Sequence, residues 1–221
     1  MGLLEVRLIK VIAKVPQPGR CKTRLIPLLG ANHAAELCAA MTADVFATVE
    51  SLGLPWSIAL DGDPEHPWVG RLPVPWEPQA EGELGPRLIR ALRGGGLAVG
   101  TDAPSLPGRL LKAALASSAE VVFAPAFDGG YTLVRVRDPV GLFEDIPWST
   151  STTLLASVNR ARSLGRSVEL LEFWYDVDCP ADLHFFQQQL KLTGPEVAPH
   201  SRALIQHWEA RGLLPQLPTG L

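Results

Sequence analysis

Four basic residues lie in a short Pro- and Gly-rich loop that follows an apolar, β-branched run at residues 6–13. The phosphate-binding candidates in this loop are Lys14, Gly19, Arg20, Lys22 and Arg24. Proline fixes φ and glycine permits tight turns, so such a loop loses little entropy when it closes around an anion. The spacing indicates phosphate binding, and the alternative is a solvated basic loop. The chain has neither a P-loop nor a Gly-x-Gly-x-x-Gly fingerprint at this place.

Carboxylates follow three of the predicted strands, each near the end of its strand. These candidates are Asp102, Asp128, Asp176 and Asp178. Open α/β sheets bind ligands outside the carboxyl ends of their strands. Mg²⁺, or Mn²⁺ in its place, takes one or two protein carboxylates together with substrate phosphate and water, which matches Asp102 with Asp176 or Asp178. Taken singly, Asp102 or Asp178 could instead cap the following helix, and Asp128 could form a turn.

Other polar residues are weaker candidates. Ser149 and Thr150 precede a predicted helix, where they would present hydroxyls to a ligand or, as Ser and Thr more often do, cap the helix. Glu83 lies at the start of another predicted helix, where it would contact a base, sugar or acceptor or face solvent. The five histidines have no ligand-like spacing.

The composition limits the class of protein. With 221 residues and 47% apolar content, residues 1–221 are expected to form one domain, with a helical tail at 195–221. The net charge of −3 argues against a nucleic-acid partner. Three cysteines without a Cys-x-x-Cys pattern argue against a disulfide framework or a zinc site. No apolar run is long enough to span a membrane, so we expect a cytoplasmic protein with reduced thiols.

Strand and helix patterns alternate along the chain. Strand patterns cover residues 6–13, 56–60, 97–100, 120–125, 131–136 and 167–174. Helical spacing covers residues 32–52, 85–93, 106–117, 152–164, 180–192 and 199–211, and the Pro- and Trp-rich residues 61–78 are expected to be irregular. This alternation predicts an α/β fold with a mostly parallel, doubly wound sheet and helices on both faces. Such a sheet would bring the basic loop and the carboxylates to one edge.

Five spaced motifs resemble a known family over almost the whole chain. They are Ala13-Lys14-x-Pro16-x-Pro18-Gly19-x-x-Lys22-Thr23-Arg24-Leu25, Gly100-Thr101-Asp102-x-Pro104-x-Leu106, Pro125-Ala126-x-Asp128-Gly129-Gly130-Tyr131, Pro147-Trp148-Ser149-Thr150 and Asp176-Val177-Asp178-x-Pro180-x-Asp182-Leu183. Together they are similar to the glycosyltransferase-like proteins called rSAM/selenodomain-associated transferase 1. The resemblance implies the nucleotide-diphospho-sugar transferase (GT-A) fold, a Rossmann-like α/β sheet with a metal-assisted nucleotide site.

Parts of the chain resemble two further families. Residues 22–25 and the ending at 176–183 are similar to phospholactate guanylyltransferases, and the ending is also similar to molybdenum-cofactor nucleotidyltransferases. By that resemblance, Asp102 and Asp176 or Asp178 would hold Mg²⁺, and the basic loop would hold the nucleotide phosphates. The chain departs from the guanylyltransferases at residues 128–131, where they carry a different Gly/Thr/Asn-rich motif.

Three functions follow as hypotheses. The first is glycosyl transfer from a nucleotide-diphosphate sugar to a small acceptor, with a metal at Asp102 stabilising the departing diphosphate and Asp128 acting as general base. The second is nucleotidyl transfer from a nucleoside triphosphate to a phosphorylated small molecule, with release of pyrophosphate. The third is a nucleotide-binding module without turnover. Further substrate contacts are expected from Gly129, Gly130, Tyr131, Ser149, Thr150 and Glu83.

Overall fold

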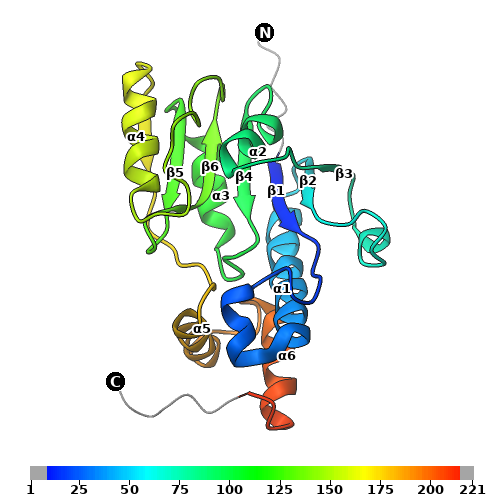
Figure 1. The fold of residues 1–221 in the computed structure, drawn as a ribbon. Coiled ribbons are helices and arrows are strands. Elements are labelled where there is room, and N and C mark those ends of the chain that lie inside the picture. Colours follow the sequence, from blue (N-terminus) through cyan, green and yellow to red (C-terminus); the bar gives the residue numbers. More distant parts are fainter. Residues whose placement is uncertain (1–8, 215–221) are drawn as a thin grey trace.

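A single seven-stranded sheet organises the protein (Figure 1). The structure is a computed structural model and describes residues 9–214. The strands are β1 (Ile9–Lys14), β2 (Trp56–Asp61), β3 (Trp76–Pro78), β4 (Gly96–Gly100), β5 (Val121–Pro125), β6 (Tyr131–Val136) and β7 (Val168–Leu170). They lie in the order β3-β2-β1-β4-β6-β5-β7. The pairings of β6 with β4 and β5 are antiparallel and the other pairings are parallel, which confirms the predicted α/β fold.

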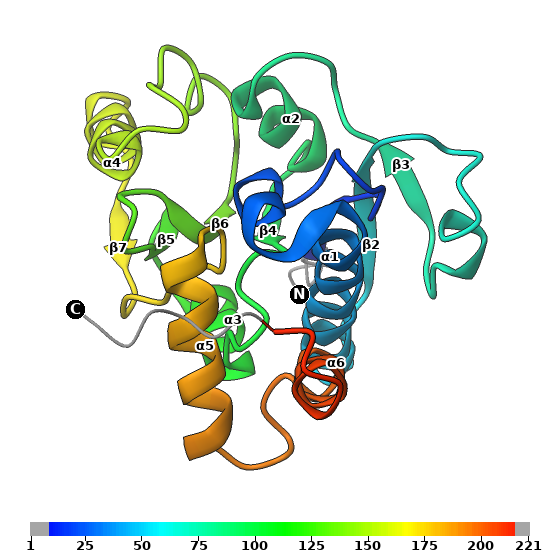
Figure 2. The ribbon, with the colours of Figure 1, turned by 60° about the horizontal axis from the view of Figure 1, so that its bottom comes forward.

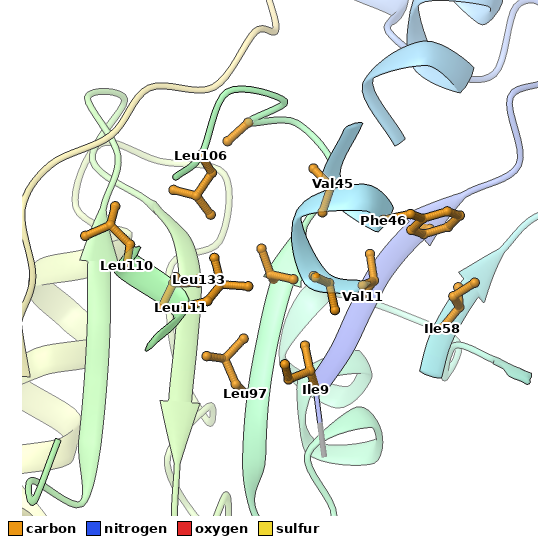
Figure 3. Close-up of a cluster of buried hydrophobic side chains, with 14 of the residues drawn as sticks. Ile9, Val11, Val45, Phe46, Ile58, Leu97, Leu106, Leu110, Leu111 and Leu133 are labelled. Carbon is orange, nitrogen blue, oxygen red and sulfur yellow. The ribbon is translucent and has the colours of Figure 1, made fainter. Parts of the chain in front are cut away.

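Helices cover both faces of this sheet (Figure 1). They are α1 (Ile26–Glu50), α2 (Leu84–Ala91), α3 (Gly108–Ala116), α4 (Thr153–Ser163), α5 (Pro180–Leu192) and α6 (Pro199–Ala210). On one face, Val45 of α1 and Leu111 of α3 belong to the same buried cluster as strand residues such as Leu97 (Figure 3). On the other face, α2 and α4 contribute to a cluster that contains Phe123 of β5. Burial on both faces explains why the strands read as apolar runs in the sequence.

A separate helical layer joins α1, α5 and α6 (Figure 2). Phe186 of α5 and Trp208 of α6 are buried there against the first half of α1. The carboxylate of Asp44, on α1, accepts the backbone N–H groups of His200 at 2.8 Å and Ser201 at 2.9 Å. These N–H groups belong to the first turn of α6, which has no helical acceptor for them. A side chain distant in sequence therefore anchors the start of α6.

Two elements near the N-terminal half differ from the prediction. Helix α1 spans Ile26–Glu50, but Gly30 within it is non-helical, with φ 78°, so the long helix follows Gly30, close to the predicted residue 32, and a short turn at 26–29 precedes it. The residues predicted as irregular, 61–78, contain the strand β3, which pairs with β2 at the edge of the sheet. A three-residue strand ending in Pro78 gives no periodic signal, and an edge strand tolerates proline because one side needs no hydrogen bond.

The last predicted strand is also shorter than expected. Only Val168–Leu170 form β7 and pair with β5, and an isolated bridge between Ala126 and Trp174 follows beyond the end of β5 at Pro125. The predicted residues 6–8 of the first strand and the last part of the predicted tail, residues 215–221, lie outside the described residues. Within residues 9–214, no helix combines the length and apolarity that crossing a membrane requires.

Candidate functional site

The carboxyl ends of β1, β2 and β4 meet at one edge of the sheet, and the loops there carry most of the predicted site residues (Figure 1). Because β6 is antiparallel, its first residues and the β5–β6 turn with Asp128 also reach this edge. The segment between β7 and α5 runs across the same edge and is fixed there by a hydrogen bond of 2.8 Å from the Val177 N–H to the Asp102 carbonyl. Sequence reasoning predicted this shared edge for Asp102, Asp128 and Asp178.

Lys22 lies at the centre of this edge with its side chain only 4% exposed. Its backbone is left-handed, with φ 44° and ψ 44°, a conformation that costs a non-glycine residue about 1 kcal/mol. The ammonium donates to Asp102 Oδ1, to the Val177 carbonyl at 2.8 Å and to Asp178 Oδ1 at 2.8 Å. Burial disfavours the charged ammonium, but attraction to the two carboxylates outweighs it and raises the pKa of Lys22. All three ammonium protons are thus bound by protein oxygens.

A basic cavity of about 360 Å³ opens beside Lys22. Its charged lining residues are Lys14, Arg20, Lys22, Arg24, Asp61, Arg87, Asp102 and Asp178. Lys14 lies 3.7 Å from Asp61 Oδ2. In residues 9–214 no ion pair involves Arg20 or Arg24, so both guanidinium groups are available to an anion. Gly19 has φ 81° and lies outside the lining, so it shapes the loop and does not contact the cavity.

The basic cavity is also lined by three residues that were not among the predicted site residues, Asp61, Gln79 and Arg87. The Gln79 amide Nε2 donates to the carbonyls of Ala13 at 2.9 Å and Ala59 at 3.0 Å, which leaves its Oε1 to accept from Arg87 Nη1 at 3.2 Å. Arg87 Nη1 also donates to Asp61 Oδ2 at 3.1 Å. Asp61 ends β2 just as Asp102 follows β4, and this position at a strand end was the available signal. Gln79 had no signal, because β3 was not predicted.

A second, carboxylate cavity of about 280 Å³ lies on the β6 side of Asp102. Its polar lining includes Asp102, Asp128, Asp176, Asp178, Tyr131, Thr132, Ser149, Thr150 and Thr153, together with Gly130. Burial, reinforced by the charges of Asp128 and Asp178, raises the pKa of Asp176 to about 6. Leu84, Asp102 and Asp178 line both cavities. The two carboxylates bound to Lys22 therefore form the wall between the basic cavity and the carboxylate cavity.

The alternative, capping roles of the aspartates are now decided for two of them. The residue that precedes α3 at the cap position is Pro107, and α5 is capped by Cys179 together with Asp182, whose Oδ2 accepts the N–H groups of Asp178 and Cys179. Asp102 and Asp178 therefore do not cap α3 or α5. Asp128 does form the turn considered for it, because its Oδ1 accepts the Gly130 N–H at 2.7 Å, and it lines the carboxylate cavity as well.

The remaining candidate contacts divide between the cavity and the framework. Thr150 lines the carboxylate cavity, but its hydroxyl donates to the Pro147 carbonyl at 2.9 Å. Gly129 is outside both linings, with φ 90°, and a Cβ there would lie 2.1 Å from the Ser151 carbonyl oxygen. Glu83 is exposed at the start of α2 and also lies outside both linings.

The donor set fits a hard divalent cation that arrives with phosphate. Residues 9–214 contain no preformed group of three or more His, Cys, Asp or Glu side chains arranged around a cation position. Mg²⁺ does not require such a group, because it takes one or two carboxylates and completes its shell with substrate phosphate and water. Asp102 and Asp178 supply two carboxylates next to the basic cavity, and Lys22 now holds both.

Comparison with known proteins supports the predicted superfamily. Residues 45–150 match the family described as "Uncharacterized protein conserved in bacteria (DUF2064)". A structure from Desulfovibrio desulfuricans, provisionally named a nucleotide-diphospho-sugar transferase, is 26% identical, with a TM-score of 0.83, over 92% of this chain and 95% of that chain. No curated protein matches the sequence.

More distant structures share the fold. The inositol-1-phosphate CTP transferase from T. maritima is 11% identical, with a TM-score of 0.55, over 90% of this chain and 96% of that chain. The 4-diphosphocytidyl-2C-methyl-D-erythritol synthase from Anaerococcus prevotii is 10% identical, with a TM-score of 0.55, over 85% of this chain and 98% of that chain. The T. maritima protein, like the Desulfovibrio desulfuricans protein, is a transferase by name, and the chain has the nucleotide-sugar transferase and nucleotidyltransferase fold.

Proposed function

We propose that this chain is a metal-dependent transferase that uses an activated nucleotide, and that it transfers a glycosyl group from a nucleotide-diphosphate sugar to a small acceptor. The observation that carries the proposal is the pair of cavities that meet at Asp102 and Asp178. A basic cavity suits a nucleotide diphosphate, and a carboxylate cavity suits a neutral or cationic acceptor. The resemblance of the five motifs to the rSAM/selenodomain-associated transferases favours sugar transfer among the transferase reactions.

The residues of the basic cavity hold the donor in this proposal. Arg20 and Arg24 bind the phosphates, and Lys22 joins them when it leaves the carboxylates. Asp102 and Asp178 would hold Mg²⁺, and we assign Asp178 in preference to Asp176 because Asp178 lines both cavities. The cation, when bound, supplies neutralising charge to the departing diphosphate.

The carboxylate cavity holds the acceptor. Asp128 faces this cavity from the β5–β6 turn and accepts the proton of the acceptor hydroxyl as it attacks the sugar. The Gly130 N–H bond to Asp128 Oδ1 fixes the carboxylate and leaves its other oxygen for that proton. Ser149 and Thr150 line the same cavity, where they orient the acceptor.

Nucleotidyl transfer is a second candidate, favoured by one observation. Arg20, Arg24 and Lys22 give the basic cavity three cations on one loop in addition to Lys14, which is more positive charge than a diphosphate alone requires. A nucleoside triphosphate would use this charge more fully. In that reaction a phosphorylated acceptor attacks the α-phosphate, and pyrophosphate leaves.

Titration calorimetry with nucleotide sugars and nucleoside triphosphates, each with and without Mg²⁺, tests the proposal. Metal-dependent binding of a nucleotide sugar, followed by release of nucleoside diphosphate with an acceptor, supports glycosyl transfer; pyrophosphate release from a triphosphate supports the second candidate. Asp102→Asn should remove the Mg²⁺-dependent part of binding. The matched control is Asp138→Asn, at an exposed aspartate beyond the far end of β6, and it should bind like the unaltered protein. If neither nucleotide class binds, the proposal is wrong.

A further inference from the structure

We propose that Cys21 and Cys38 form a reversible disulfide when the protein meets a peroxide, and that this disulfide closes the basic cavity to phosphate. The chemical step is independent of the transferase assignment, and its effect on nucleotides rests on the proposed function. Cys21 lies in the basic loop directly before Lys22, and Cys38 lies on α1. The two thiols and Ala35 form a buried cluster of their own. Both thiols also line the basic cavity.

The two thiols are placed to react with each other. They are 4% and 6% exposed and lie in the same small buried cluster, and the Cys21 Sγ donates to the Gln17 carbonyl at 3.4 Å within its own loop. The hydrogen bond with Cys38, helped by the charges of Lys14 and Lys22, lowers the pKa of Cys21. The same hydrogen bond together with burial raises the pKa of Cys38. Cys21 is therefore the nucleophile and Cys38 the resolving thiol.

The reaction balances with hydrogen peroxide as the oxidant. The Cys21 thiolate attacks one peroxide oxygen, the O–O bond breaks, and the departing hydroxide takes a proton to become water. Cys38 then attacks the sulfur of the resulting sulfenic acid, the S–S bond forms, and the sulfenic oxygen leaves as water with the Cys38 proton. Two thiols and one peroxide give one disulfide and two waters. A small oxidant suits a pair whose access is through the cavity.

The disulfide would act through Lys22. To reach a phosphate, Lys22 must leave Asp102, Asp178 and the Val177 carbonyl, and its backbone belongs to the loop that contains Cys21. A covalent bond from Cys21 to α1 restrains that loop in the conformation that holds Lys22 on the carboxylates. Oxidation should therefore weaken binding of inorganic tripolyphosphate with Mg²⁺ by about tenfold, within the usual range of coupling between sites.

Peptide mapping tests the chemical step. The protein is treated with hydrogen peroxide, digested without reduction, and analysed by mass spectrometry; cleavage after Lys22 and Arg24 separates the two cysteines unless a disulfide joins them. We expect a linked Cys21–Cys38 pair and a free Cys179, the internal control thiol, whose backbone caps α5. In Cys38→Ala, oxygen should accumulate on Cys21 instead. Unmodified Cys21 and Cys38, or linkage of either to Cys179, overturns the proposal.

Calorimetry with tripolyphosphate and Mg²⁺ tests the consequence. The reduced, oxidised and dithiothreitol-treated proteins are compared, and Cys38→Ala should bind equally well before and after treatment with limiting peroxide. Weakened binding that the reductant restores supports control by the disulfide, and equal binding by the linked protein overturns it. If the reduced protein binds no phosphate ligand, the transferase proposal is wrong. The disulfide is tested separately, by the peptide mapping.

Discussion

Replacing Lys22 by methionine should strengthen the binding of a divalent cation in the absence of nucleotide. The ammonium occupies the space between Asp102 and Asp178, and a cation that binds there must compete with it. Methionine keeps an unbranched side chain of similar length in a position that is 4% exposed, and it removes the charge. The two carboxylates would then face each other without a counter-charge and bind Mn²⁺ more tightly.

The magnitude follows from the contacts and their exposure. Unit charges about 4 Å apart attract by roughly 4 kcal/mol at the effective dielectric near a protein surface. The Asp102 and Asp178 side chains are 54% and 36% exposed, so water screens much of this attraction. After that discount we expect a gain of ~1–2 kcal/mol. A gain of this size corresponds to about tenfold tighter binding of Mn²⁺.

Calorimetric titration with Mn²⁺, followed by titration with tripolyphosphate, measures both sides of the exchange. Lys22→Met should gain Mn²⁺ affinity and lose tripolyphosphate affinity, whereas the control Arg24→Met should lose tripolyphosphate affinity only, since Arg24 lines the same cavity without an ion pair to either carboxylate. Circular dichroism establishes that both variants are folded. Unchanged or weaker Mn²⁺ binding by folded Lys22→Met would refute the competition between ammonium and metal.

Three further predictions concern the framework that holds the site. Asp44→Ala should lower the free energy of unfolding by ~2–3 kcal/mol in urea titration, because two N–H groups at the start of α6 lose a charged acceptor. Arg135→Met should lower the free energy of unfolding by ~3 kcal/mol in the same assay, because this buried guanidinium donates to three backbone carbonyls at and beyond the end of α3. A decrease below about 1 kcal/mol would contradict that role. Gly129→Ala should reduce turnover, because its Cβ would meet the Ser151 carbonyl at 2.1 Å and displace the turn carrying Asp128; unchanged turnover would show that the turn is not required.

The alternation of strands and helices was predictable because each main element buries enough apolar residues to give a period. The strand β3 was not, because Trp76–Pro78 span only three residues at an edge. The short turn at 26–29 was not predicted, because the non-helical Gly30 separates it from the long part of α1 that the apolar spacing indicated. The antiparallel direction of β6 was not assigned from its period-2 alternation, which is the same in either direction; the available signal was the short connection 126–130, which is too short for a parallel crossover.

The site was predictable to the level of a shared edge and not to the level of contacts. Strand-end positions placed Asp102 and Asp178 near the basic loop, and the structure brings them together. Their bonds to Lys22 join residues 80 and 156 positions apart, and such contacts depend on side-chain directions that spacing does not encode. The basic loop therefore contains two cations paired with protein carboxylates, Lys14 and Lys22, beside two without an ion pair, Arg20 and Arg24, a difference that residue type alone does not reveal.

The two cavities share one wall, but different segments of the chain form the rest of each cavity. Residues of β1, β2 and the loops that follow them shape the basic cavity, while the β5–β6 turn and the approach to α4 shape the carboxylate cavity. Asp102 and Asp178 belong to both. Sequence change confined to residues 126–153 can therefore remodel one chamber while the other keeps its form. In the proposed transferase, exchange of that segment between homologues would change the acceptor and leave the donor cavity unchanged.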